Sequence, residues 1–281
     1  MDRLRVTILG CGSSGGVPRV GDGWGACDPD EPKNRRTRCS LLVERFREGA
    51  RRPTRVIVDT APDMRFQLLA AGVDRLDGVL FSHDHADQTH GIDDLRTIAY
   101  AMRQRIPSWL DEATASTLMV RFAYCFHGAD GYPGILEARP MPPPGSVLTV
   151  EGPGGPIRAI PLAQDHGVGP SLGFRFGPAA YNNDVVDLPE ASFALLGGLK
   201  LWIVDALRYT PHPTHAHVDK SLGWIARLAP ERAVLTNLHI DLDYNRVATE
   251  TPAHVEPAFD GWSWETSITD ELVAAGPHAA A

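Results

Sequence analysis

The stretch Ser82-His83-Asp84-His85-Ala86-Asp87-Gln88-Thr89-His90-Gly91 decides the fold, because it gathers three histidines and two aspartates in one short segment. Residues 76–81 before it are largely apolar and predict a buried strand. Residues 92–106 after it place apolar side chains at helical spacing. In layered α/β folds, a strand-to-helix turn lies at the carboxyl end of a strand, where ligands bind. We therefore expect the functional site at this turn.

The spacing of the polar side chains in this turn favours metal binding. His83 and His85 are two residues apart, so in an extended segment they can point the same way. Asp87 adds a carboxylate two residues later, and imidazole with carboxylate suits zinc, iron or manganese. The alternative is a polar surface loop with chance histidines. The clustering of histidine with aspartate favours the metal site.

The stretch resembles the metal-binding signature of the metallo-β-lactamase-fold hydrolases, His-x-His-x-Asp-His followed shortly by glycine. His83, His85, Asp87 and Gly91 match it, and the resemblance extends over most of the chain. It implies an α/β fold, a four-layer αβ/βα sandwich of two mixed β-sheets, formed as a single domain over residues 1–281. Within that domain, residues 107–145 are a candidate lid over the pocket.

The nearest branch of that family contains the tRNA 3′-processing endonucleases and the phosphoribosyl cyclic phosphodiesterases of phosphonate breakdown. The resemblance implies a metal-dependent hydrolase. It favours a phosphodiesterase that uses a metal-activated water on a small, cyclic or nucleotide-like phosphodiester. A thioester or lactone hydrolase, and a non-hydrolytic binding protein with a degenerate site, remain the alternatives, because a fold does not fix its chemistry.

The resemblance also assigns roles to residues outside the turn. It implies that His166 supplies a third imidazole to the first metal and that Asp184 bridges two metals. Asp59 is expected to support the metal loop, because metal-bound histidines need a partner for the other ring nitrogen. Asp187 is expected to cap the helix that Pro189 begins.

The same resemblance implies a catalytic histidine beside the substrate. His215 matches the general acid of related phosphodiesterases best, and a histidine is suited to protonating a leaving oxygen near neutral pH. His217 is the second candidate for this role, and His212 is expected at the surface. Asp87 is expected to orient the attacking water or act as base when a second metal is absent.

Two residues depart from the family pattern, and both concern the second metal. Gln88 and Asn237 stand where the family has histidines, and neutral amides are poor ligands compared with imidazole. The sequence therefore predicts one firm metal site, made by the imidazoles of His83, His85 and His166 with Asp184. The occupancy of the second site is left open.

A histidine stands two positions after each of these residues, His90 after Gln88 and His239 after Asn237. Either histidine is a candidate to replace a missing ligand of the second metal. A shift of two residues turns a side chain by about 160° on a helix, so His90 is expected to point elsewhere. The same shift keeps the face on an extended strand, so His239 is the better substitute ligand. Asp87, Asp184 and His239 are then the expected ligands of a second ion.

Composition restricts the partners. The 281 residues carry a formal net charge of −8, with 43% apolar and 22% charged residues, which is ordinary for a soluble protein. The acidic balance disfavours a long nucleic acid and favours a small substrate. No long apolar run predicts a membrane span, and the N-terminus lacks a secretory signal, so we expect a cytoplasmic protein. The oligomeric state is left open, with a homodimer as one candidate.

Overall fold

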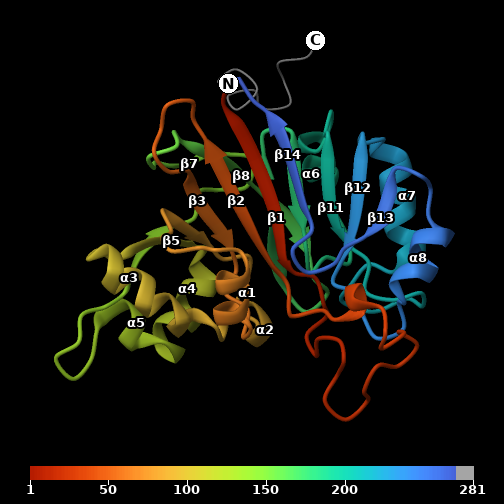
Figure 1. Cartoon of the computed structure of the whole chain (residues 1–281), viewed down its shortest axis with the longest axis horizontal. Coiled ribbons are helices and arrows are strands. Elements are labelled where there is room, and N and C mark those ends of the chain that lie inside the picture. Colours follow the sequence, from red (N-terminus) through yellow and green to blue (C-terminus); the bar gives the residue numbers. More distant parts are fainter. Residues whose placement is uncertain (270–281) are drawn as a thin grey trace.

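The computed structural model describes residues 1–269 of the chain. Within these residues, two seven-stranded sheets form the middle of the molecule (Figure 1). The first sheet has the order β14 (Ser263–Ser267), β1 (Arg3–Gly10), β2 (Ser40–Phe46), β3 (Thr54–Val58), β4 (Gly78–Leu80), β5 (Ile106–Leu110) and β6 (Leu136–Pro140). The second has the order β13 (Val255–Pro257), β12 (Arg232–Thr236), β11 (Leu201–Asp205), β10 (Ala179–Asn182), β9 (Pro170–Phe176), β8 (Ile157–Asp165) and β7 (Leu148–Val150).

Both sheets are mixed, as predicted. β1, β2 and β3 pair antiparallel, whereas β3, β4, β5 and β6 pair parallel. In the second sheet β10, β11, β12 and β13 are parallel. Parallel neighbours end at the same edge of a sheet, so the loops after β3 and β4, and those after β10, β11 and β12, emerge together.

Helices cover the outer faces of the two sheets. The first sheet packs with α1 (Met64–Ala70), α3 (Arg96–Met102), α4 (Glu112–Arg121) and α5 (Ala123–His127) in one apolar cluster. The second sheet packs with α6 (Glu190–Leu195), α7 (Val218–Leu228) and α8 (Tyr244–Glu250) in another. Short helices α2 (Ala86–Thr89), η1 (Pro32–Asn34) and η2 (Ile92–Leu95) lie in the connections. The predicted four-layer sandwich is confirmed.

The facing surfaces of the two sheets share one apolar core. Val6, Val43 and Val56 of the first sheet belong to the same buried cluster as Phe174 and Ile203 of the second. Burial of this apolar area drives the sheets together. None of the helices among residues 1–269 is long and apolar enough to cross a membrane.

Several element predictions were wrong in detail. The helix predicted over residues 92–106 is divided into η2 and α3, which ends where Arg103 adopts the left-handed conformation (φ 53°). In residues 114–126 apolar side chains recur four residues apart and predict one helix, but the structure interrupts it at Phe122. The sequence predicts one last strand around residues 255–264, whereas the structure has two strands there, β13 and β14, in different sheets. Pro189, and not Asp187, occupies the N-cap position of α6.

Residues 107–145 contribute to the scaffold. They contain most of β5, helices α4 and α5, and β6, and these two strands extend the first sheet to its edge. Arg121 at the end of α4 donates to the carbonyl of Asp84 at 2.7 Å, so this segment contacts the histidine-rich turn. A covering role over a substrate stays a prediction.

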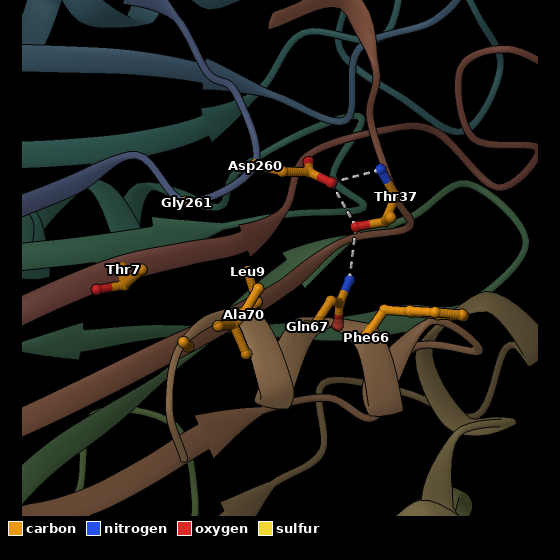
Figure 2. A pocket seen from close by; sticks show the side chains of 9 residues that line it. Thr7, Leu9, Thr37, Phe66, Gln67, Ala70, Asp260 and Gly261 are labelled. Atoms are coloured by element: carbon orange, nitrogen blue, oxygen red, sulfur yellow. Dashed lines mark hydrogen bonds between the residues drawn. The ribbon is translucent and has the colours of Figure 1, made fainter. Parts of the chain in front are cut away.

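A hollow of about 270 Å³ lies beside β1 and α1 (Figure 2). Asp260 accepts hydrogen bonds there from the backbone N–H and hydroxyl of Thr37, at 2.7 and 2.6 Å. Gln67 in turn donates to the Thr37 hydroxyl at 2.9 Å. Asp260 and the Thr37 hydroxyl are paired in this way, whereas Oε1 of Gln67 is buried without a partner among the described residues. No histidine lines this hollow.

We expect Phe174→Ala to lower the free energy of unfolding by about 3–5 kcal/mol, because it leaves a cavity between the sheets. The ring of Phe174 is fully buried, whereas that of Phe66 is 67% exposed. Phe66→Ala is therefore the matched control, with an expected change within about 0.5 kcal/mol. Urea denaturation of both variants measures the difference. Equal losses would contradict the assignment of the inter-sheet core.

Candidate metal centre

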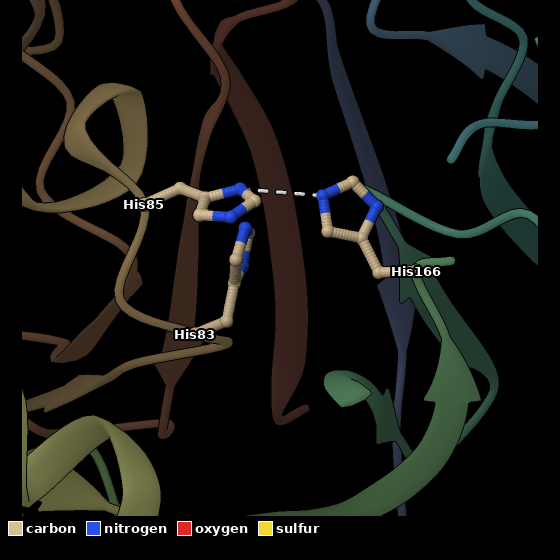
Figure 3. A group of neighbouring side chains, drawn as sticks. All are labelled: His83, His85 and His166. Carbon is tan, nitrogen blue, oxygen red and sulfur yellow. Dashed lines mark hydrogen bonds between the residues drawn. The ribbon is translucent and has the colours of Figure 1, made fainter. Parts of the chain in front are cut away.

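Three imidazoles from the two sheets meet at one point (Figure 3). His83 and His85 follow β4 and precede α2, whereas His166 follows β8. The ring centroids of His83 and His85 are 4.5 Å apart, and each lies 5.0 Å from that of His166. One ligand nitrogen of each ring lies within 4.8 Å of the others. The structure thus brings together the three histidines predicted as ligands.

The hydrogen bonds of these rings leave nitrogens for a cation. Nδ1 of His166 lies 2.7 Å from the carbonyl oxygen of Thr214 and donates to it, so Nε2, which lies 3.3 Å from Nδ1 of His85, carries the lone pair. Nδ1 of His83 lies 2.9 Å from the hydroxyl of Ser82. Nε2 of His83 is buried and has no hydrogen-bond partner among the described residues. A buried nitrogen without a partner, facing two other imidazoles, fits a bound cation.

The protonation of the rings agrees with metal binding. Burial and the neighbouring His85 lower the pKa of His83 well below its ordinary value. Burial and His215 lower the pKa of His166 to about 4. Both rings are therefore neutral at pH 7, and the neutral imidazole is the form that coordinates a metal.

Asp59 supports the metal loop through Ser82. The carboxylate is fully buried and accepts from the Ser82 backbone N–H at 2.8 Å and from its hydroxyl at 2.7 Å. The Ser82 hydroxyl is in turn the neighbour of Nδ1 of His83. The expected support of a histidine by Asp59 therefore passes through a serine, which sequence reasoning did not identify.

Asp184 lies beside the imidazoles and contacts both residues that depart from the family pattern. Its carboxylate belongs with His166 and His215 to a second group of ligand atoms within 4.8 Å. Gln88 Nε2 donates to Oδ2 at 2.7 Å, and Asn237 Nδ2 donates to Oδ1 at 3.1 Å. Burial raises the pKa of Asp184 well above its ordinary value. The two amides thus compensate a buried carboxylate.

Three other candidate ligands lie outside both groups of ligand atoms found in residues 1–269. Oδ2 of Asp87 is 3.5 Å from Nε2 of Gln88. Nδ1 of His239 lies 3.1 Å from a carboxylate oxygen of Asp241. The ring of His90 packs edge-on against Phe122, with centroids 5.5 Å apart, and so points away as expected. Metal binding by Asp87 and His239 stays a prediction.

His215 is held by a carboxylate beside the imidazole cluster. Its Nδ1 lies 2.8 Å from Oδ2 of Asp205, and its ring centroid lies 4.8 Å from that of His166. Burial lowers the pKa of His215, but the attraction of Asp205 and the hydrogen bond to it outweigh burial and raise it to about 9. The protonated ring is a donor at neutral pH.

His215 lines a polar hollow of about 270 Å³. The other lining residues are Ser13, Ser14, Arg19, Asp87, Leu207, Arg208, His212, Asn237 and His239. Arg19, Arg208 and His212 were missed as members of the site. Two sequence signals pointed to this part of the site: the glycine-rich loop of residues 10–16, which borders the active site in resembling proteins, and the polar segment around residues 208–217. The place of Arg19 beside them depends on the tertiary fold.

The structure places His212, and not His217, beside His215. The ring centroid of His212 lies 5.2 Å from that of His215, and His212 lines the hollow beside it. His217 instead occupies the N-cap position of α7. Of the three histidines in this segment, His212 is therefore the neighbour of His215 in the hollow.

The two mixed sheets with a histidine cluster at the ends of their strands define a metal-dependent hydrolase of the metallo-β-lactamase fold. Residues 54–240 match the family model described as the β-lactamase superfamily domain. The chain therefore belongs to the β-lactamase superfamily, in the branch that includes the PhnP family. This fold implies binding of a divalent metal.

Solved structures and one curated protein extend the comparison. A crystal structure of a new diphosphatase from the PhnP family is 32% identical, with a TM-score of 0.84, over 95% of this chain and 98% of that one. Human tRNase Z, short form, is 15% identical, with a TM-score of 0.62, over 94% and 98% of the two chains, and shows the fold alone. An octanoyltransferase of Porphyromonas gingivalis is 31% identical over 266 residues. That match covers 92% of this chain but 51% of the octanoyltransferase, so the chain spans about half the length of this curated relative.

We expect Asp59→Asn and Ser82→Ala to weaken metal binding about 10- to 100-fold, because each removes a group that orients His83. Competition with a chelating indicator measures the affinity for zinc. Circular dichroism shows that the variants remain folded. Unchanged affinity in both folded variants would show that this chain of hydrogen bonds does not position a ligand.

Proposed function

We propose that the protein is a phosphodiesterase that hydrolyses a small phosphodiester, cyclic or nucleotide-like. The hollow beside His215 carries this proposal. Two guanidinium groups, Arg19 and Arg208, line it together with two serines and His212. Arginine pairs well with the planar arrangement of phosphate oxygens, whereas a neutral ester offers no charge for it to meet.

The guanidinium groups are fixed at the hollow. Nε and one terminal nitrogen of Arg208 donate to the carbonyl oxygens of Thr210 and Pro211, at 3.1 and 2.8 Å. Arg19 donates to the hydroxyl of Ser13 at 3.3 Å. Asp22 is 3.9 Å from Arg19 and is largely exposed, so it neutralises Arg19 weakly. The hollow therefore retains positive charge for an anionic substrate.

His83, His85, His166 and Asp184 would hold the cation, with zinc or manganese as the candidates. A divalent cation in such a site supplies Lewis acidity and hydroxide at neutral pH. The rim carboxylate of Asp87 would orient the attacking water. Asp205 holds Nδ1 of His215, which leaves Nε2 to protonate the leaving oxygen as the bond from phosphorus to that oxygen breaks.

The relatives support a phosphodiesterase, and one of them also suggests a second activity on acyl esters. The PhnP-family structure is described as a diphosphatase, and its likeness covers nearly the whole of both chains. The octanoyltransferase relative favours an acyl ester or thioester as the second candidate substrate. Half of that protein has no counterpart in this chain, so its acyl-transfer activity carries less weight. The proposal also includes a small substrate, a cytoplasmic location and a homodimer.

His215→Gln is expected to lower kcat on bis(p-nitrophenyl) phosphate and on cyclic nucleotides by about 10²- to 10⁴-fold, because it removes the proton donor. Removal of metal with a chelator should abolish activity, and zinc or manganese should restore it. His217→Gln is the matched control and should retain activity. A His215→Gln variant with full activity would exclude the proposed acid.

We expect Arg19→Ala and Arg208→Ala to raise KM for a phosphodiester by about 10- to 100-fold, the value of one charged hydrogen bond. Hydrolysis of p-nitrophenyl acetate should change less, because that substrate is neutral. The control is Arg232→Gln, since Arg232 begins β12 at the end far from the hollow and pairs with Glu256. A wild-type protein that cleaves the neutral ester and no phosphodiester would favour the acyl alternative.

A further inference from the structure

The residues that face Asp184 do not fit the second cation that the family resemblance implies. Gln88 and Asn237 stand where histidines would coordinate it, and both side chains are almost fully buried, with 1% and 2% exposed. Each has its amide nitrogen, and not its oxygen, directed at Asp184. An N–H group has no lone pair to give to a metal.

Three amide donors contact the carboxylate of Asp184, which His166 and His215 also approach. Oδ2 accepts from Gln88 at 2.7 Å and from the side chain of Asn183 at 2.8 Å, while Oδ1 accepts from Asn237 at 3.1 Å. Three amide donors therefore converge on one buried carboxylate from three separate segments of the chain. A second cation beside Asp184 would have to displace these bonds and would face the positive ends of the amide dipoles.

Neither nearby histidine restores the missing ligands. The ring of His90 packs against Phe122. His239 lies beside Asp241, and among residues 1–269 it belongs to neither group of converging ligand atoms. At the first set, Nε2 of His83 is buried without a partner among the described residues and faces two further imidazoles. Oε1 of Gln88 is also buried without a partner, but the amide nitrogen, and not this oxygen, contacts Asp184.

We propose that the protein holds one catalytic cation and that the amides of Gln88 and Asn237 replace the second. The amides hold Asp184 in place by hydrogen bonds, which is the structural task that a bridged second cation performs in a two-metal site. Gln88 and Asn237 are therefore positioning residues for the single site. This inference depends on the metal centre and is independent of the identity of the substrate.

Counting of bound zinc tests the proposal. The full chain is saturated with zinc, freed of loosely bound ions by gel filtration, and analysed by inductively coupled plasma mass spectrometry. We expect close to one ion per chain in the wild type and close to two in Gln88→His/Asn237→His. The control Gln104→His/Asn245→His adds two histidines at exposed positions and should stay at one. Two tightly held ions in the wild type would overturn the proposal, as would a folded double variant that still holds one.

A second variant tests the role of the amide itself. Gln88→Met keeps the length of the side chain but removes the N–H donor, so the affinity of the single zinc site should fall about tenfold or more. Unchanged affinity would show that the bond from Gln88 to Asp184 does not position a ligand. Because both readouts count or titrate zinc, a protein that binds one ion but cleaves no phosphodiester would refute the proposed function and leave the single-site inference standing.

Discussion

The meeting of three imidazoles across the interface between two sheets is the constraint on which the site depends. His83 and His85 belong to the first sheet and His166 to the second, and the only covalent link between them is a chain segment of some eighty residues. Their spacing is therefore set by the packing of the inter-sheet core, in which residues such as Val56 and Phe174 meet. Close packing permits little sliding, so the apolar core fixes the distance between polar groups that never touch it.

Three residues that follow strands near the site have strained backbone angles. Asp59, Asp184 and Asn237 all adopt left-handed backbone angles, with φ of 62°, 52° and 63°. Residues other than glycine adopt this region rarely, and such strain persists only where the surrounding structure enforces it. Each of the three directs a polar side chain at the metal loop or at Asp184, so the strained positions and the chemical positions coincide.

Much of this arrangement could be predicted from the sequence, because the signals are local. The apolar run before Ser82 depends on neighbouring residues, and the metal signature lies within one turn. The mixed sheets followed from the resemblance that this signature supports. By contrast, the places of Arg19 and Ser82 depend on contacts between distant segments or on which rotamer a hydroxyl adopts. β5 and β6 were missed for a related reason: each is short and lies beside a helix, so no long periodic pattern marks it.

The electrostatic balance of the site follows from the exchange of imidazole for amide. A two-metal site places four positive charges beside its bridging carboxylate, whereas the proposed single-cation site would have two, with neutral amide donors around Asp184. In such a site no second metal would face the substrate, and two guanidinium groups, Arg19 and Arg208, line the hollow together with Asn237. A guanidinium does not lower the pKa of a water as a metal does, but it neutralises phosphate oxygens and binds them in a fixed geometry. In the proposed enzyme the cation and its imidazoles would therefore serve the nucleophile, and the arginines would bind the anionic substrate.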